Sequence, residues 1–396
     1  YERVYKEKER VLKLDLYRKI ENIEDWKEIN KLPTENYKLV KDIDFLNAGK
    51  EVLITNTYTG ILDGGNHRIK NVRVEGGESG LIKSLSGTVK NLRIENYEQK
   101  INSGTYGGVI SVANSKSEIN NIHISNAKIE IGEEREAIVG VLNGKNSLGK
   151  VENCSVNHIE IKTEGEAKSV MLGGLIGGAY STTISNNYGT DIKIEVKETL
   201  NSQGIGGLVG ENGGTIQYCY VEGKIETEKE KAGGIAGNNT GSVKNNYSKV
   251  DIETTSIYVG GIVGENQKRG ENGVIYNLYL GNLYSRGEIE NRIVGNGILS
   301  ERNYGYKEQR INGEKKEDPV VRLLSREEIL KESSYEDLLY MENNFNYEEL
   351  EKGILPKLYY EEKRELLPNQ KDIGIEEKEI KIEEVYSEKA DVNTGN

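Results

Sequence analysis

Few residues of this chain have the types and spacing that acid-base or metal chemistry needs. Only three histidines occur among the 396 residues, at His67, His123 and His158. A zinc peptidase holds its metal with two histidines one helical turn apart and a glutamate between them, and this HExxH pattern is absent. The three histidines fall in different slots of the repeat described below, so we expect them to face solvent. We predict no catalytic residue and no metal ligand.

Acidic residues are abundant, but they form no recognisable pair. The acidic run at residues 133–136 could bind calcium or form a solvated loop, and the glycine-aspartate nonapeptide of calcium β-rolls does not occur. A carbohydrate-active β-helix would need carboxylates gathered on one face. Paired acids on neighbouring repeats are not evident, because Lys, Ser, Thr and Asn fill most outward positions. We predict no cofactor and keep a carbohydrate-active enzyme as an alternative.

The two cysteines, Cys154 and Cys219, share one slot of the repeat but lie two repeats apart, with the coil of Asn186 between them. Strand spacing then separates them by roughly 10 Å, which is beyond the roughly 7 Å limit between the Cα atoms of a disulfide. We expect two separate buried thiols.

Tyrosine is the commonest aromatic residue, with 24 copies, and many lie in the later repeats. An exposed aromatic strip would suit a sugar or protein ligand. Aligned rings also stabilise neighbouring strands without any ligand, and we favour this second interpretation. The candidate binding residues are Tyr218, Tyr220, Tyr247, Tyr276 and Tyr279.

The composition predicts an elongated array with a narrow core. Glycine is frequent at 46 copies, whereas proline has 4 and phenylalanine and methionine have 2 each. So few bulky apolar residues suit stacked coils better than a broad globular core. The formal net charge of −12 disfavours nucleic-acid partners, and no stretch is apolar enough to enter a membrane directly. The chain starts at Tyr1 without methionine, so we interpret it as a piece of a longer precursor.

A glycine-marked repeat runs through the middle of the chain. A glycine, usually the second of a doublet, precedes two aliphatic residues, and successive copies are 28, 32, 34, 33, 27 and 27 residues apart, at Gly80, Gly108, Gly140, Gly174, Gly207, Gly234 and Gly261. Spacing this regular indicates a repeat architecture.

Two further patterns with a period of two follow each glycine. The first has the form aliphatic, any, Asn, and the second is a shorter alternation such as Ile129 and Ile131. Three short strands per repeat, without helices between them, predict a stacked coil. We expect the asparagines to form a structural ladder in which each amide bonds the next, comprising Asn91, Asn121, Asn153, Asn186, Asn245 and Asn277.

The fold class we predict is all-β: a right-handed parallel β-helix of about seven coils with small helical caps at both ends. Residues 1–75 form an N-terminal cap and lead-in, with a helix after Asn22, a strand at 37–45 and a hairpin-type turn at Asp63-Gly64. Residues 76–305 form the solenoid. Residues 306–368 form a C-terminal cap, in which a capping box at Ser325 starts a short helix that closes the stack. Residues 369–396 are a linker or the first strand of a following module.

The segments Gly207-Leu208-Val209-Gly210 and Gly261-Ile262-Val263-Gly264 resemble the core of the GLUG-repeat family. The resemblance covers about residues 22–300, including the lead-in at 37–44 and 60–64. It implies a surface protein of Gram-positive bacteria or Bacteroidetes, or the region upstream of the catalytic domain in immunoglobulin A1 protease-type zinc metallopeptidases. Nothing of that peptidase's catalytic motif occurs here, so no catalytic residue is carried over.

We therefore predict a non-catalytic spacer or binding module of a secreted or cell-wall-attached protein of a Gram-positive bacterium. Its expected partners are a host glycoprotein or glycan and the other domains of the same precursor. Two alternatives stay open: a substrate-positioning exosite of such a metallopeptidase, and the carbohydrate-active enzyme considered above.

Overall fold

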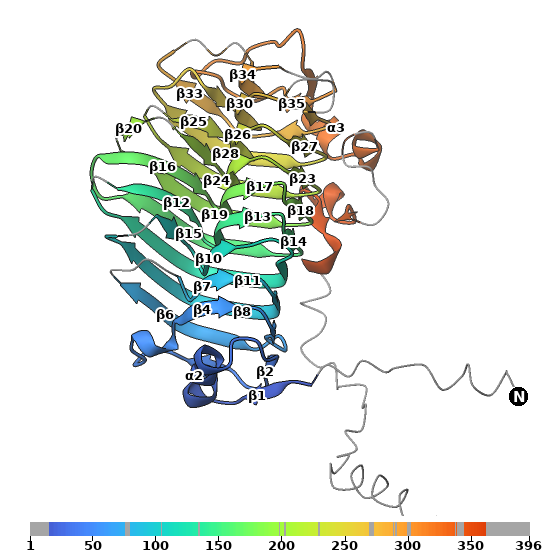
Figure 1. Cartoon of the computed structure of the whole chain (residues 1–396). Coiled ribbons are helices and arrows are strands. Elements are labelled where there is room, and N and C mark those ends of the chain that lie inside the picture. Colours follow the sequence, from blue (N-terminus) through green and yellow to red (C-terminus); the bar gives the residue numbers. More distant parts are fainter. Residues whose placement is uncertain are drawn as a thin grey trace, which may run out of the picture.

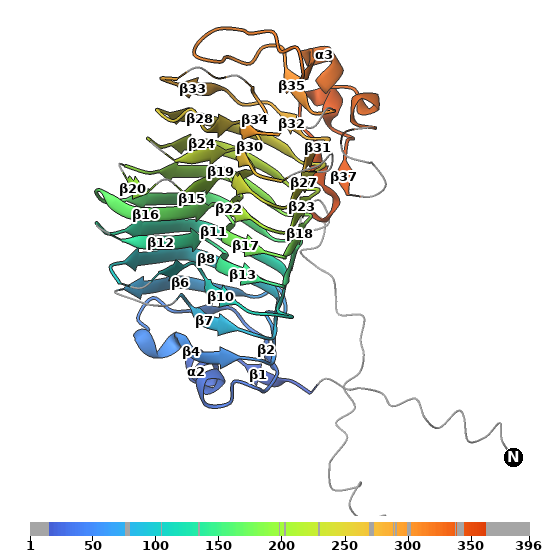
Figure 2. The same cartoon turned by 45° about the horizontal axis from the view of Figure 1, so that its top comes forward.

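The computed structural model shows three parallel β-sheets wound round one core, a solenoid of about eight turns (Figures 1 and 2). It describes residues 16–75, 80–103, 105–133, 135–197, 199–201, 203–228, 230–268, 273–287, 289, 291–298, 302–336, 338 and 344–361. The all-β parallel solenoid expected from the repeat is thus confirmed. The predicted segment 369–396 lies outside the described residues.

Sheet A is the largest of the three. In most coils it is a strand that bends once, so that two of the strand patterns seen in the sequence belong to one sheet. Its strands are β1 (Arg18–Ile20), β2 (Tyr37–Leu39), β3 (Ile43–Asp44), β5 (Ile61–Asp63), β6 (Arg68–Glu75), β8 (Thr88–Ile101), β11 (Glu118–Ile131), β14 (Lys150–Glu152), β15 (Ser155–Thr163), β18 (Thr183–Ser185), β19 (Tyr188–Glu195), β23 (Thr215–Gln217), β24 (Tyr220–Glu226), β27 (Ser242–Lys244), β28 (Tyr247–Thr254), β31 (Val274–Ile275), β32 (Leu278–Tyr279), β33 (Leu283–Ser285), β35 (Tyr304–Tyr306) and β36 (Arg322–Leu324).

Sheets B and C complete each coil. Sheet B consists of β4 (Ile54–Tyr58), β7 (Ile82–Leu85), β10 (Ile110–Ala113), β13 (Asn143–Ser147), β17 (Ile176–Tyr180), β22 (Val209–Asn212), β26 (Ala236–Asn239), β30 (Val263–Asn266) and β34 (Val294–Gly297). Sheet C consists of β9 (Tyr106–Gly107), β12 (Glu136–Gly140), β16 (Ala167–Gly173), β21 (Gly204–Gly206), β25 (Lys231–Gly233) and β29 (Val259–Gly260), with β20 (Thr199–Asn201) beside β16.

The glycine doublets form the corner between sheets C and B. Gly206 ends β21, and β22 begins at Val209, so the chain turns at Gly207. A Cβ atom on Gly207 would lie 2.2 Å from the carbonyl oxygen of Gly234 in the next coil. Glycine therefore recurs here because stacked corners approach too closely for any side chain.

Aliphatic side chains from all three sheets fill a continuous interior. Equivalent residues lie in register on neighbouring coils, as for Val209, Ala236 and Val263, and all three are fully buried. Each coil adds only a few side chains, and its neighbours bury them. A chain with little phenylalanine and methionine can therefore still form a dry core.

The N-terminal cap forms as predicted at its helix. Helix α2 (Ile23–Lys31) starts at Asn22, whose side chain accepts hydrogen bonds from the amides of Glu24 and Asp25. Trp26 is fully buried and donates from Nε1 to the carbonyl of Val52 at 2.7 Å, in the 3₁₀ turn η1 (Lys50–Val52). The helix covers the first coils with this apolar side (Figure 2).

Two features of the lead-in differ from the expectation. The predicted strand at 37–45 is split into β2 and β3. The turn at Asp63-Gly64 is not a hairpin, because β5 pairs with β2 and β8, while β6 pairs with β3 and β8, all in parallel. The turn is a corner of a coil, so the lead-in already continues the stack.

The C-terminal cap also has the predicted capping box but not the predicted position. In α3 (Arg326–Ile329) the Ser325 side chain accepts from the Glu328 amide, and the Ser325 amide donates to the Glu328 carboxylate. Ile329 then packs into a second apolar cluster on the outside of sheet A instead of closing the open end. This cluster also holds η2 (Glu332–Tyr335), η3 (Leu350–Lys352) and the antiparallel pair β37 (Phe345–Asn346) and β38 (Lys357–Leu358). We call residues 344–361 the flank segment (Figure 1).

Among the described residues, none of the helices is long and apolar enough to cross a bilayer.

Candidate functional site

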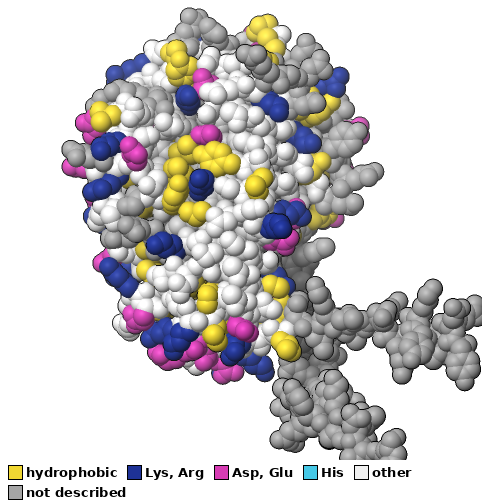
Figure 3. Space-filling view, viewed as in Figure 1, with side chains coloured by type: hydrophobic (Ala, Val, Ile, Leu, Met, Phe, Trp, Pro, Cys, Tyr) yellow, Lys and Arg dark blue, Asp and Glu magenta, His cyan; other side chains and the backbone are white. Residues whose placement is uncertain are grey.

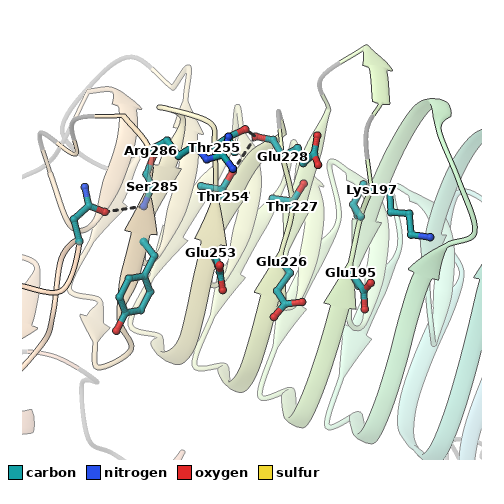
Figure 4. A pocket seen from close by; sticks show the side chains of 13 residues that line it. Glu195, Lys197, Glu226, Thr227, Glu228, Glu253, Thr254, Thr255, Ser285 and Arg286 are labelled. Atoms are coloured by element: carbon teal, nitrogen blue, oxygen red, sulfur yellow. Dashed lines mark hydrogen bonds between the residues drawn. The ribbon is translucent and has the colours of Figure 1, made fainter.

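A groove lies where the later strands of sheet A end and the chain turns towards sheet C (Figure 4). Its volume is about 660 Å³. The lining residues come in rows, because the same position of successive coils faces the groove: Glu195, Val196, Lys197, Glu226, Thr227, Glu228, Glu253, Thr254, Thr255, Tyr284, Ser285, Arg286 and Asn312.

A row of three glutamates forms one side of this groove. Glu195 pairs in register with Glu226, and Glu226 with Glu253, while Tyr284 continues the row on β33. Strand spacing of about 4.8 Å separates neighbouring members. The expectation that no acids pair on neighbouring coils is therefore wrong. The register could not be deduced from the sequence because the coil lengths differ from 27 to 34 residues.

Lysines of the adjacent row lie between these carboxylates. The Nζ atom of Lys193 is 3.5 Å from a carboxylate oxygen of Glu195, and that of Lys224 bridges Glu226 and, at 3.6 Å, Glu253. The side chains of Glu195, Glu226 and Glu253 are 37%, 35% and 63% exposed. A glycosidase acid needs an apolar pocket that keeps it protonated, whereas these carboxylates are open to water and paired. The row is suited to accepting hydrogen bonds.

The floor of the groove is built from hydroxyl and amide groups. Thr254 donates to the Glu228 carbonyl at 3.2 Å, and the Ser285 amide donates to the Asn312 side chain at 2.7 Å. Thr227 and Thr254 are buried, so their positions are fixed by the coil. The carboxylates and hydroxyls of the groove offer polar contacts. The partly exposed Tyr284 ring adds one flat apolar face beside them.

The histidines are separate, as predicted, but one of them does not face solvent. His67 lies near Asp42 with 3.5 Å between Nδ1 and the carboxylate, and His158 pairs with Asp191 at an exposed site. His123 is buried: its ring nitrogens bond Ser155 and Asn121, and the Tyr360 ring lies over it at 6.1 Å. The prediction failed for His123 because the flank segment covers its outward position.

Within the described ranges, which omit residue 134 of the acidic run, the structure has no group of three or more His, Cys, Asp or Glu side chains that could hold a metal ion.

The predicted asparagine slot is the bend in sheet A. Asn91, Asn121, Asn153, Asn186 and Asn245 all have positive φ angles between 54° and 57°. Asparagine tolerates this left-handed conformation better than other residues with a Cβ atom. Asn121 donates to Asn91 at 2.8 Å and Asn91 to Asp63 at 3.1 Å, so amides link coil to coil at this end of the stack. Asn245 instead donates to the carbonyl of Leu338 in the C-terminal cap.

Asn277 belongs to a different row. The residue at the bend of its coil is Tyr276, with φ of 58°, so Asn277 lies one position further and points into the core. It donates to the Asn303 side chain at 3.1 Å, and Asn246 donates to Asn277 at 3.0 Å. A buried ladder of side-chain amides therefore runs beside the bend. The sequence pattern placed Asn277 at the bend, one residue away from its true equivalent in this coil. The buried ladder was therefore not predicted.

The cysteines lie in this same buried row. Cys154 and Cys219 are free and fully buried, with Asn187 of the intervening coil between them. The Asn187 side chain accepts from the Cys154 amide at 2.8 Å, and the Cys219 sulfur accepts from the Asn187 amide at 3.4 Å. The expectation of two separate buried thiols is confirmed.

Three of the five candidate binding tyrosines are inaccessible. Tyr220, Tyr247 and Tyr279 are 3%, 1% and 1% exposed, while Tyr218 and Tyr276 are half-buried. Tyr279 points inward and donates to the carbonyls of Val250 and Asn282. These three rings cannot form an exposed ligand strip.

The outward tyrosines stack coil upon coil beneath the flank segment. Ring centroids are 5.2 Å apart for Tyr188 and Tyr220, and 4.8 Å for Tyr220 and Tyr247, with nearly parallel planes. Tyr220 donates to the Glu361 carboxylate and Tyr247 to the carbonyl of Pro356. The rings stack across neighbouring strands as in the interpretation favoured above, and no local sequence pattern indicated that a later segment would cover them.

Two further side-chain ladders were missed by sequence reasoning. One lies on the outer face of sheet A at a second left-handed position, where Asn96 donates to Asn71 and Asn126 to Asn96. The other is buried at the end of sheet B, where Asn212 donates to Asn239 at 2.7 Å and Asn239 to Asn266 at 2.9 Å. The recurrence of Asn two residues after Gly210, Gly237 and Gly264 could have revealed the second ladder.

Comparison with known proteins identifies one motif in this chain. The fold and its stacked corners define a parallel β-solenoid. Residues 201–226, which include β21 to β24 and the groove residue Glu226, match the GLUG motif. A sequence search of curated proteins finds no match.

Two solved structures are similar to parts of the chain. One, named IgA1 Protease, has 20% identity and a TM-score of 0.45 over 67% of this chain and 21% of its own. The other, from Bacteroides ovatus and assigned as an immunoglobulin A1 protease, has 14% identity and a TM-score of 0.42 over 87% of this chain and 92% of its own. The chain thus spans about a fifth of the length of the first.

Proposed function

We propose that the chain is a rigid binding module of a longer secreted or cell-wall-attached protein of a Gram-positive bacterium, and that its groove holds a neutral glycan of a host glycoprotein. The observation that carries this proposal is the row of Glu195, Glu226 and Glu253 ending at Tyr284. Carboxylates accept hydrogen bonds from vicinal hydroxyls, and a tyrosine ring offers a flat face to the apolar side of a sugar.

The periodicity of the groove supports an elongated ligand. A carboxylate recurs on three successive coils, at Glu195, Glu226 and Glu253, about 4.8 Å apart, so a chain of sugars could make similar contacts along this row. The four lining carboxylates, Glu195, Glu226, Glu228 and Glu253, are balanced by the lining Lys197 and Arg286 and by Lys193 and Lys224 next to them. A groove without excess positive charge favours neutral sugars over acidic ones.

A glycan array of neutral and acidic host glycans, probed with the labelled chain, tests the proposal. We expect binding to neutral glycans, and a loss of about tenfold in affinity for Glu226→Ala and for Tyr284→Ala, which corresponds to about 1.4 kcal/mol. Glu28→Ala on helix α2 is the matched control and should bind as the parent chain does. Equal binding by the parent and both groove variants would exclude the groove, and release of reducing sugar ends would point instead to the carbohydrate-active alternative.

A second candidate is a substrate-positioning region beside a metallopeptidase domain. The GLUG motif at 201–226 supports it, because the resemblance described above includes such regions. Two observations would test it: an HExxH helix in the coding sequence that follows Asn396, and binding of immunoglobulin A1 by the isolated chain. An immunoglobulin that binds equally well before and after enzymatic removal of its glycans would favour this candidate over the first.

A further inference from the structure

An apolar patch surrounds a single lysine on the face formed by sheets B and C. Figure 3 shows hydrophobic side chains gathered round a basic one near the middle of this face. On strand β13 of this face, the Nζ atom of Lys145 lies 5.7 Å from the ring centroid of Tyr106 and 5.5 Å from that of Tyr180. None of these residues lines the groove described above.

The patch is organised by the coil. Tyr106, Ile138 and Met171 lie in register on β9, β12 and β16, and the Tyr180 hydroxyl lies 3.7 Å from the Met171 sulfur. Gly178 follows Lys145 in the register of sheet B, and a Cβ atom there would lie 3.0 Å from the Tyr180 ring. The missing side chain lets this ring lie flat over the strand beside the lysine.

Lys145 has no anionic partner in the described part of the chain. Lysines on sheet A differ: Lys128 is 2.9 Å from a Glu130 carboxylate, and Lys162 is 3.3 Å from the same group. In a protein of net charge −12, a half-buried cation held only by two aromatic rings keeps its capacity to pair with an anion. The two rings strengthen such a pair relative to one in open water, and the nearest acid of the same row, Glu211, lies two coils from Lys145 beyond Gly178.

We infer that this patch, here called the Lys145 patch, binds a sugar that carries a carboxylate. The carboxylate pairs with the Lys145 ammonium, and the apolar side of the sugar ring packs on Tyr106 and Tyr180. A peptide ligand fits less well, because β13 already pairs on both sides with β10 and β17 and offers no free edge for main-chain hydrogen bonds. The inference rests on the proposed role in glycan binding but assigns a second site with the opposite charge preference.

The test is titration of the whole chain with sialyllactose, which carries a carboxylate, and with lactose, its neutral counterpart. We expect sialyllactose to bind at least tenfold more tightly than lactose, and the preference to weaken as salt rises. Lys145→Gln, which removes the charge but keeps a polar side chain, should remove the preference, and Tyr180→Leu should reduce affinity for sialyllactose several-fold. Lys31→Gln, on helix α2, should retain the parent's affinities. Unchanged thermal unfolding of each variant shows that the fold is intact.

The proposals for the Lys145 patch and for the groove can be contradicted independently of each other. A Lys145→Gln chain that keeps the preference for sialyllactose overturns this inference while leaving the groove proposal intact. Loss of neutral-glycan binding in Glu226→Ala, with sialyllactose binding retained, separates the two sites in the other direction. An acidic peptide that displaces sialyllactose completely at equal concentration, or the absence of any sialyllactose binding, would also overturn it.

Discussion

Buried polar side chains recur along the interior of this solenoid, and the Asn246, Asn277 and Asn303 amides bond to one another from coil to coil. The Asn277 side chain accepts from the Asn246 amide and donates to the carbonyls of Val243 and Ile275. Such amides fix the stacking register, because a shift by one residue would leave them unpaired in a dry core.

Replacement of Asn277 by alanine should therefore cost about 2 kcal/mol, since it leaves buried donors and acceptors of the adjoining coils without partners. Urea unfolding followed by circular dichroism measures the change in the free energy of unfolding. Asn47→Ala, at an exposed position before η1, is the control and should change it by less than about 0.5 kcal/mol. Equal losses for both variants would contradict the ladder.

The thiols allow a second prediction at this scale. Burial raises the pKa of the Cys219 thiol to about 12, so the reactive thiolate is scarce at neutral pH. We expect neither Cys154 nor Cys219 to react with a thiol reagent in the folded chain, and both to react after unfolding in guanidinium chloride. Detection of fewer than two thiols after unfolding without reductant would indicate a disulfide and contradict the structure.

Among the elements, sheet A has two different outer regions. On the outer face, the early strands and the strand ends far from the bend carry rows in which Lys and Glu alternate. Next to the bend in the later coils, the outer positions instead hold Tyr188, Tyr220, Tyr247 and Leu278. The flank segment and the C-terminal cap bury this apolar strip and form a cluster distinct from the interior core. Exposed aromatic strips of this length promote association between proteins. Burial of the strip by the flank segment and the C-terminal cap therefore limits such association.

A substitution that weakens the packing of the flank segment should therefore loosen that segment without unfolding the solenoid. Phe345 is 1% exposed and packs 6.0 Å from the Tyr247 ring. Phe345→Ala should destabilise the segment by about 3–5 kcal/mol through the cavity that it leaves. Hydrogen exchange should accelerate within 344–361 but stay slow in β17 and β22. Tyr359→Ala, at an exposed position of the same segment, should have little effect, and accelerated exchange throughout the coils would contradict two separate clusters.

For the whole molecule, the two ends of the stack are closed by different means. Helix α2 covers the first coils with Trp26 and Ile29. At the far end Arg292 is 1% exposed and pairs with the buried carboxylate of Asp318 at 3.2 Å, while Gln309 accepts from its guanidinium at 3.0 Å. Burial lowers the pKa of Arg292 from its ordinary value, and Asp318 opposes this change.

Asp318→Ala would leave the Arg292 guanidinium buried without its carboxylate, which should cost about 3–5 kcal/mol. Because each coil contacts mainly its neighbours, hydrogen exchange should accelerate in β30, β33 and β34 and remain slow in β7 and β10. Glu308→Ala removes a carboxylate from an exposed ion pair with Lys315 and should cost less than about 1 kcal/mol. A uniform acceleration over all coils would show that the stack unfolds as one unit.

The sequence by itself determined the coil. Glycine at the corner, aliphatic residues of period two and asparagine at the bend are local requirements of backbone geometry, and they recur through most of the stack, with Tyr218 and Tyr276 replacing asparagine at two bends. For the same reason Asn22 and Ser325 identified the starts of their helices, because a cap bonds only to amides within the next turn.

Only the tertiary structure decided which surfaces remain open. The groove depends on the register of Glu195, Glu226 and Glu253, and coils of unequal length hide this register in the sequence. Burial of Tyr220 and Tyr247 depends on residues more than 100 positions later, as in the bond from Tyr247 to Pro356. Lys145 likewise meets Tyr106 and Tyr180 only when three coils are stacked. Local patterns specify the turn of a solenoid, whereas its binding faces arise from side chains that only stacking and long-range cover bring together.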